Sequence, residues 1–423
     1  IADNILGQKK SIWYGGIVIM LGHIILAIPA DTTVFYIGLG TVALGTGLLK
    51  PNISSVVGEL YPEGGARRDA AFSIFYMGIN LGSVLGITIV GYLGQKISWH
   101  MGFGAAAVGM LLGLIVFKYG SEKYLKGVGD VPAPKIETAE SKVESSKNGK
   151  IGLGIVALLV VVLTVLQLTG NIDMTTAQGL AQGAGVIIVT VSMFYFLFIL
   201  FAGGLTTLEK RRVFVLIVFF LAAALFWSGF EQAGSSLQIF AERHTERTFG
   251  GWEMPSSWFQ NFNGTFILMF APILASLWIF LSARGLNPST PVKFALGLLL
   301  LGAGFFVMEM GAEVAVTGQL ASPLFLTFTY ILHTIGELCL SPVGLSTYTK
   351  LAPKRYVSQL MGIWFVAASL GNLIAGLFAG GFDEENIQQM PSLFQQVTVF
   401  SIGFGLILLI FSKPVKKWMG GIS

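Results

Sequence analysis

Residues 213–241 read VFVLIVFFLAAALFWSGFEQAGSSLQIFA, and this stretch decides the class of fold. It contains a single ionisable residue, Glu231, and it exceeds the ~20 apolar residues that a helix needs to cross a bilayer. Backbone polar groups must be satisfied within a membrane span, so such runs are predicted to be helices. They are also about twice too long for the strands of a membrane barrel. Working outward from this stretch, the same criterion predicts twelve spans in all, at approximately residues 11–30, 34–60, 69–95, 99–118, 151–170, 183–205, 213–241, 256–283, 291–309, 322–349, 357–380 and 393–412.

The composition of the whole chain supports this class. Of the 423 residues, 54% are hydrophobic and 11% are charged, and the mean hydropathy is +0.75. Soluble domains carry about 25% charged residues, so a soluble enzyme, a nucleic-acid-binding protein and a secreted disulfide scaffold are excluded. Cys339 is the one cysteine, so no intramolecular disulfide can form. The expected surroundings are a lipid bilayer, and no nucleic-acid partner is expected.

The positions of lysine and arginine test the number of spans. Of the 26 Lys and Arg residues, 22 fall at segments that the twelve spans put on one side. Lys96, Arg243 and Arg247 fall on the other side, and Lys50 lies inside a span. The positive-inside rule makes the richer side cytoplasmic. We therefore expect a multi-pass protein of the inner (plasma) membrane with both ends of this chain in the cytoplasm.

The apolar pattern divides the chain into four parts. Residues 1–118 hold four spans, and residues 206–423 hold six. Residues 119–150 mix Pro, Ser, Glu and Lys, which predicts a flexible cytoplasmic linker. Residues 151–205 hold two spans with almost no ionisable groups, which indicates a peripheral, lipid-facing helix pair.

Polar residues within the spans are the candidate functional groups, because ionisable residues at mid-membrane are costly. Lys50, Glu231 and Glu337 lie about halfway along three different spans, Asn80 lies at a similar depth, and Asn263 lies nearer an outer end. Five helices contributing one polar group each is what a shared central cavity requires. The alternative for each is a packing role: a buried Lys50–Glu231 pair, a protonated Glu337, and asparagines that only join helices.

Four further residues join the candidate set because of their neighbours. Tyr76, Trp227 and Trp364 are predicted to line the cavity, although each taken singly is as well explained by packing. Ser341 follows Glu337 by one turn and precedes Pro342, whose ring bends a helix. Such a bend serves either as a gate hinge or as a static kink.

Several of these segments resemble one transporter family. FYMGINLGS (75–83), GTGLLKPNISS around Lys50, GFEQAGSS (229–236) and GELCLSPVGLSTYTKLAP (336–353) resemble motifs of the proton-dependent oligopeptide transporter (POT/PTR) family of the major facilitator superfamily. The resemblance covers essentially the whole chain. It implies an all-α polytopic membrane protein with two six-helix bundles and the inserted helix pair of prokaryotic members.

One departure from the family pattern concerns the start of the chain. Its opening, IADNILGQKK, resembles the loop after the second helix of a major facilitator, and no ExxERF motif occurs. The first two helices, with an arginine implicated in ligand binding, are therefore expected to be missing from this sequence.

The resemblance also implies a function, namely a proton-coupled symporter that imports di- and tripeptides by alternating access. Lys50 would face the peptide carboxylate, Glu337 the amino terminus, and Asn80 and Asn263 the peptide amides or amino end. Glu231, with Lys50, would couple transport to protons. Protons serve as the coupling ion, neither a cofactor nor a metal is expected, and the protein is expected to be a monomer.

Two other functions stay open at this point. A major facilitator of another small solute, such as nitrate, would use the same scaffold. A polytopic membrane enzyme is more remote, because the chain contains no HExxH, GxSxG or P-loop motif.

Overall fold

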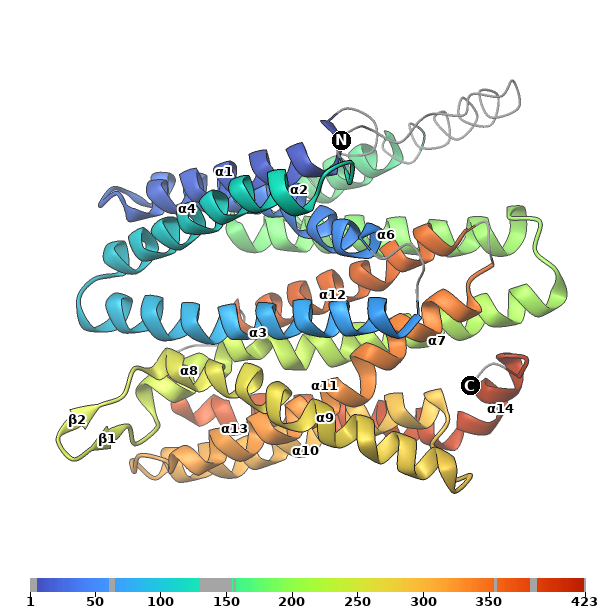
Figure 1. Cartoon of the computed structure of the whole chain (residues 1–423). Helices are drawn as coiled ribbons and strands as arrows, with labels where there is room; N and C mark the ends of the chain where they lie inside the picture. The colour runs from blue at the N-terminus through green and yellow to red at the C-terminus, as the bar shows by residue number, and fades with distance from the viewer. Residues whose placement is uncertain are drawn as a thin grey trace. The chain divides into compact units, whose positions relative to one another are not determined.

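The computed structural model describes residues 6–60, 65–129, 154, 157–353, 356–380 and 386–421. The chain divides into two compact units, Ile1–Thr138 and Ala139–Ser423, and each is described by itself. Figure 1 labels their helices. In the described residues eleven helices are long and apolar enough to cross a membrane.

The N-terminal unit contains four helices, α1 Gln8–Ala27, α2 Thr32–Glu59, α3 Gly65–Lys96 and α4 Trp99–Tyr124. Helix α1 packs against both α2 and α4, and α3 packs against α4. Glycines allow α1 and α2 to approach closely: a Cβ at Gly45 would lie 2.7 Å from the Gly15 carbonyl oxygen. Small residues at such a crossing are typical of membrane helix pairs.

The C-terminal unit is larger. Its first described continuous stretch of helix is the short apolar segment Ala157–Leu168. Its further elements are α6 Ala177–Ala202, α7 Thr207–Phe230, η2 Glu231–Gly234, α8 Ser236–Arg243, η3 Ser256–Gln260, α9 Asn261–Ala283, α10 Thr290–Val316, α11 Pro323–Leu351, α12 Val357–Gly380, η5 Ile387–Gln389, α13 Met390–Ile410 and α14 Ser412–Trp418. A hairpin of β1 Thr248–Phe249 and β2 Trp252–Glu253 joins α8 to η3.

The core of this unit is aromatic and closely packed. Helix α10 packs against α11 and α13, and α7 packs against α12. The rings of Phe219 and Phe294 stack with centroids 4.4 Å apart, and the Tyr348 hydroxyl donates a hydrogen bond of 2.7 Å to the Leu216 carbonyl. These contacts fix α7, α10 and α11, which makes α11 a rigid support for the polar residues that it carries.

Most of the predicted spans are confirmed, with end shifts of a few residues. Eleven of the twelve correspond to the long apolar helices. The remaining prediction, 151–170, corresponds to Ala157–Leu168, and most of residues 151–156 lie outside the described set.

Two predictions about the extent of helices were wrong. Residues 213–241 are not one continuous helix, because α7 ends at Phe230 and the chain passes through the 3-10 turn η2 before α8. Gly234 and Ser235, which have weak helix preference, stand at this turn, and the Ser236 hydroxyl donates to the Gln232 side-chain oxygen across it. Residues 119–124, predicted to belong to a linker, are part of α4, which runs to Tyr124. Residues 130–150 of the predicted linker lie outside the described set.

Candidate functional site

A hydrogen-bonded asparagine–glutamate pair joins α9 to α11 in the C-terminal unit. Asn263, in the first turn of α9, donates through Nδ2 to Glu337 Oε2 at 2.9 Å and to Thr334 Oγ1 at 3.2 Å. Glu337 is only 8% exposed. Burying a carboxyl group is costly unless it is hydrogen-bonded, so this contact stabilises Glu337 at its position.

Glu231 lies at the break between α7 and η2. Its side chain is half-buried, and its carboxyl group is within electrostatic range of that of Glu337. A charge change at one carboxyl group is therefore felt by the other. The broken helix also gives Glu231 a position at a helix end, where backbone geometry differs from that of the regular span predicted for it.

Aromatic side chains lie close in sequence to these acidic residues, on the same helices. Trp227 lies edge-on to Phe226 and Phe230, with centroids 5.7 and 5.2 Å apart. His333 is buried between Phe305 and Phe230, and its Nε2 lies 3.2 Å from the Leu301 carbonyl oxygen. A buried imidazole satisfied by a backbone carbonyl suits a packing role.

Two other predicted residues lie on or behind α11. Trp364 is buried against Tyr348, at 5.2 Å between centroids, and covers Gly344, where a Cβ would clash with the indole. The structure therefore gives Trp364 a buried packing position against α11, the helix that bears Glu337. Ser341 follows Glu337 by four residues and so shares its helix face. Its half-buried hydroxyl has no hydrogen-bond partner among the described residues.

The remaining predicted residues belong to the N-terminal unit. Lys50 is exposed in the second half of α2, past the midpoint predicted for it, and precedes Pro51, which lies inside the helix. Asn80, on α3, is buried, and its Nδ2 donates to the Tyr76 carbonyl at 2.9 Å. Tyr76 is 44% exposed. Helices α2 and α3 pack together, so this unit carries its candidate residues on neighbouring helices.

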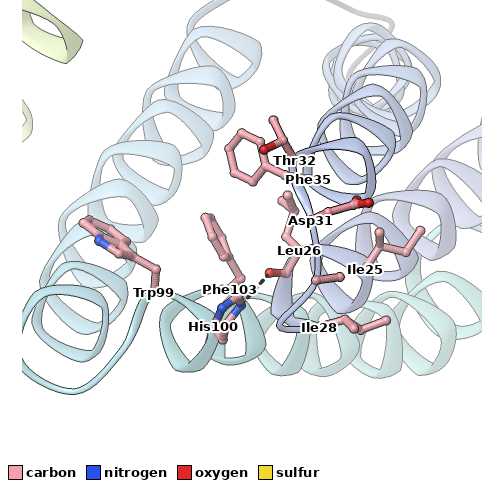
Figure 2. Close-up of a pocket in the computed structure, with 10 residues that line it drawn as sticks. Ile25, Leu26, Ile28, Asp31, Thr32, Phe35, Trp99, His100 and Phe103 are labelled. Atoms are coloured by element: carbon pink, nitrogen blue, oxygen red, sulfur yellow. Dashed lines mark hydrogen bonds between the residues drawn. The ribbon is translucent and has the colours of Figure 1, made fainter.

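A hollow of about 460 Å³ in the N-terminal unit lies apart from these residues (Figure 2). It lies where α1 ends and α2 and α4 begin. There His100 Nδ1 is 3.4 Å from the Leu26 carbonyl oxygen, and Asp31 caps α2 through the Val34 amide. None of the predicted site residues lines it. The two polar contacts given above hold helix ends.

Thr334 was missed by the sequence reasoning. It precedes Glu337 by three residues on α11 and accepts the second hydrogen bond from Asn263. The spacing of three residues was the available signal, because residues i and i+3 of a helix share a face. Over the described ranges, the side chains of His, Cys, Asp and Glu form no cluster of three or more that could hold a metal.

A helical, polytopic chain with polar groups inside its apolar helices indicates a membrane transporter. The family model described as the POT family matches residues 9–399, and the chain belongs to that family, which has the major facilitator fold.

Relatives of known name extend over nearly the whole chain. It is 42% identical to the Bacillus subtilis protein named "Uncharacterized transporter YclF", covering 100% of this chain and 82% of the relative. It is 38% identical to the "Peptide transporter YePEPT" of Yersinia enterocolitica, covering 99% and 82%. It is 34% identical to a "Di-/tripeptide transporter" of Lactococcus lactis, covering 100% and 84%.

Solved structures show the same likeness. A crystal structure of a peptide transporter POT in complex with sulfate superposes with a TM-score of 0.85 at 37% identity, covering 99% of this chain and 83% of that one. A POT family transporter in complex with 5-aminolevulinic acid gives a TM-score of 0.82 at 32% identity, covering 98% and 83%.

Proposed function

We propose that this protein is a proton-coupled symporter that imports di- and tripeptides by alternating access. The observation that carries the proposal is the Asn263–Glu337 hydrogen bond, buried in an apolar bundle within electrostatic range of Glu231. The names of the relatives from Yersinia and Lactococcus support peptides as the substrate class.

The chemistry of the substrate explains the residue types. A short peptide is a zwitterion, so its binding site needs an anion for the ammonium end and a cation for the carboxylate end. Glu337 is assigned to the ammonium end, with Asn263 and Ser341 beside it as hydrogen-bonding groups. Lys50 is assigned to the carboxylate, and Asn80 to the peptide amide. These contacts go to groups that every short peptide shares.

The side chains of the peptide need a separate surface. Two aromatic residues are assigned to this surface. Tyr76 is exposed, and Trp227 is half-buried. Trp364 acts indirectly in this proposal, because it packs behind α11 and holds the Glu337 segment in place.

Proton coupling is assigned to Glu231. In this proposal its affinity for a proton responds to the charge of Lys50. A carboxyl group at a helix break changes its surroundings when the helix moves, and its affinity for a proton changes with them. Each charge that crosses the membrane gains about 2.3 kcal/mol per 100 mV, which is the energy available to drive uptake. The charge distribution supports an orientation with both ends of the chain in the cytoplasm.

Proteoliposome uptake tests this proposal. Labelled dialanine should accumulate under an inward proton gradient, and a protonophore should abolish the accumulation. Unlabelled dipeptides should compete, whereas nitrate should not. Uptake that nitrate inhibits and dipeptides leave unchanged would assign the scaffold to another solute.

A further inference from the structure

A second polar hollow lies at the opposite end of the C-terminal unit from the β1–β2 hairpin. Its volume is about 520 Å³, and it is lined by the end of α9, the α9–α10 loop, the start of α10, the end of α11, and α14. The charge distribution assigns this end to the cytoplasm, because Lys210, Arg211 and Arg212 begin α7 here.

Three lysines converge on this pocket from three helices. Lys293 comes from the first turn of α10, Lys350 from the last turn of α11, and Lys416 from α14. Lys293 and Lys350 are close enough to interact electrostatically. Three like charges around one hollow repel one another, so the arrangement favours a bound anion.

The lining offers no carboxylate to balance these charges. Among the described residues that line the pocket, the uncharged polar groups are hydroxyls and one amide, at Ser282, Asn287, Ser289, Thr290, Ser346 and Thr347. The Ser289 side chain makes no capping hydrogen bond to α10. The described acidic residue at this end, Glu209, is engaged in the capping box of α7 with Thr206. Hydroxyl, amide and ammonium donors without an acid suit a phosphate group.

The position of Lys293 indicates that the pocket lies at the level of the lipid headgroups. Its Nζ lies 4.6 Å from the centroid of the Trp278 ring, a cation–π contact that holds the ammonium group in place. Tryptophan is enriched at the level of the lipid headgroups. Other residues of α14, Val415 and Trp418, line an apolar hollow of about 300 Å³ that could accept hydrocarbon.

We infer that this pocket is a binding site for a phosphate group, supplied by the headgroup of an anionic phospholipid of the cytoplasmic leaflet or by soluble phosphate. Basic pockets between membrane helices on the cytoplasmic side bind anionic headgroups in this way. The site is separate from the proposed peptide site, whose acidic residues Glu231 and Glu337 lie at mid-span.

Native mass spectrometry of the detergent-solubilised chain tests the inference. Phosphatidylglycerol and phosphatidylethanolamine with identical acyl chains are added in turn. The chain should retain phosphatidylglycerol at least about tenfold better, and Lys293→Gln/Lys350→Gln/Lys416→Gln should weaken that binding by about 100-fold.

The matched control removes the same charge from the same end of the molecule. Lys210→Gln/Lys413→Gln/Lys417→Gln changes three lysines that do not line the pocket, and it should keep most of the preference. Equal losses in the two triple variants would overturn the inference, since net charge alone would then explain binding. If the pocket variant fails to fold, Lys293→Gln is compared with Lys413→Gln by the same criterion.

A thermal-unfolding titration with inorganic phosphate, against chloride at matched ionic strength, separates the two sources. Phosphate that stabilises the original chain but not the pocket variant, and displaces phosphatidylglycerol, supports the site and adds a soluble ligand. Stabilisation by lipid alone restricts the site to headgroups. If neither the lipid nor phosphate distinguishes the pocket variant from its control, the pocket is not an anion site.

Discussion

Helices α11 and α2 each carry an ionisable residue within an apolar stretch, but the two helices bury that residue differently. In the C-terminal unit, 56% of the apolar stretch of α11 is buried, and Glu337 is hydrogen-bonded to Asn263. In the N-terminal unit, 11% of the stretch of α2 is buried, and Lys50 is exposed.

This difference bears on function because a lysine at mid-membrane cannot face lipid cheaply. An exposed Lys50 therefore suits a helix face that lines a water-filled cavity or contacts a ligand. Glu337 accepts a hydrogen bond through Oε2 within its own unit, and a carboxylate can accept further hydrogen bonds from a ligand. In the function proposed above, Glu337 would be a preorganised anionic group, and Lys50 would be a cation whose partner is the carboxylate of the peptide.

The largest expected effect is on coupling. Glu231→Gln should abolish accumulation of dipeptide under a proton gradient, because the amide cannot exchange a proton. It should leave counterflow exchange, which needs no net proton movement, near its original rate. Uptake into proteoliposomes in both modes is the measurement. Glu242→Gln, at an exposed position on the next helix, is the control and should retain both modes. Loss of exchange as well as accumulation would remove the specific coupling role of Glu231.

A smaller effect, on stability, is expected when the two asparagines are replaced, one in each unit. Asn263→Ala deprives the buried Glu337 of a donor and should lower the free energy of unfolding by about 1–3 kcal/mol. Asn80→Ala removes a bond to a carbonyl of its own helix, Tyr76, and should cost less than about 1 kcal/mol. Thermal unfolding in detergent measures both. Equal losses would mean that Glu337 does not depend on Asn263.

How much of this could be predicted from the sequence depends on the range of the interactions. The spans follow from local composition, and most of them were predicted correctly. Glu337 lies at the middle of its helix, as predicted, whereas Lys50 lies in the second half of α2. The pairing of Asn263 with Glu337 joins residues 74 positions apart, so no local pattern contains it. The break at Glu231 was missed because apolar length alone does not distinguish a continuous helix from one interrupted by a 3-10 turn. The buried contact of Trp364 with Tyr348 of α11 likewise depends on tertiary packing, which no local pattern contains.

The smallest expected effect concerns packing in the N-terminal unit. A Cβ at Gly45 would meet the Gly15 carbonyl, whereas a Cβ at Gly47 meets nothing within 4 Å. Gly45→Ala should therefore separate α1 from α2 and lower stability by about 1–2 kcal/mol. Gly47→Ala should be neutral or slightly stabilising. Thermal unfolding measures the stability of the two variants. Equal stability would show that the α1–α2 contact tolerates a wider spacing.

The most direct test of the division between the units combines variants with edited peptides. Affinities for dialanine, its carboxyl amide and its N-acetyl form are measured with the original chain, Lys50→Gln and Glu337→Gln. The account predicts that amidation weakens binding to the original chain about tenfold or more but hardly affects Lys50→Gln, and that N-acetylation does the same for Glu337→Gln. If both variants remain as sensitive to both edits as the original chain, Lys50 and Glu337 do not bind the two ends of the peptide.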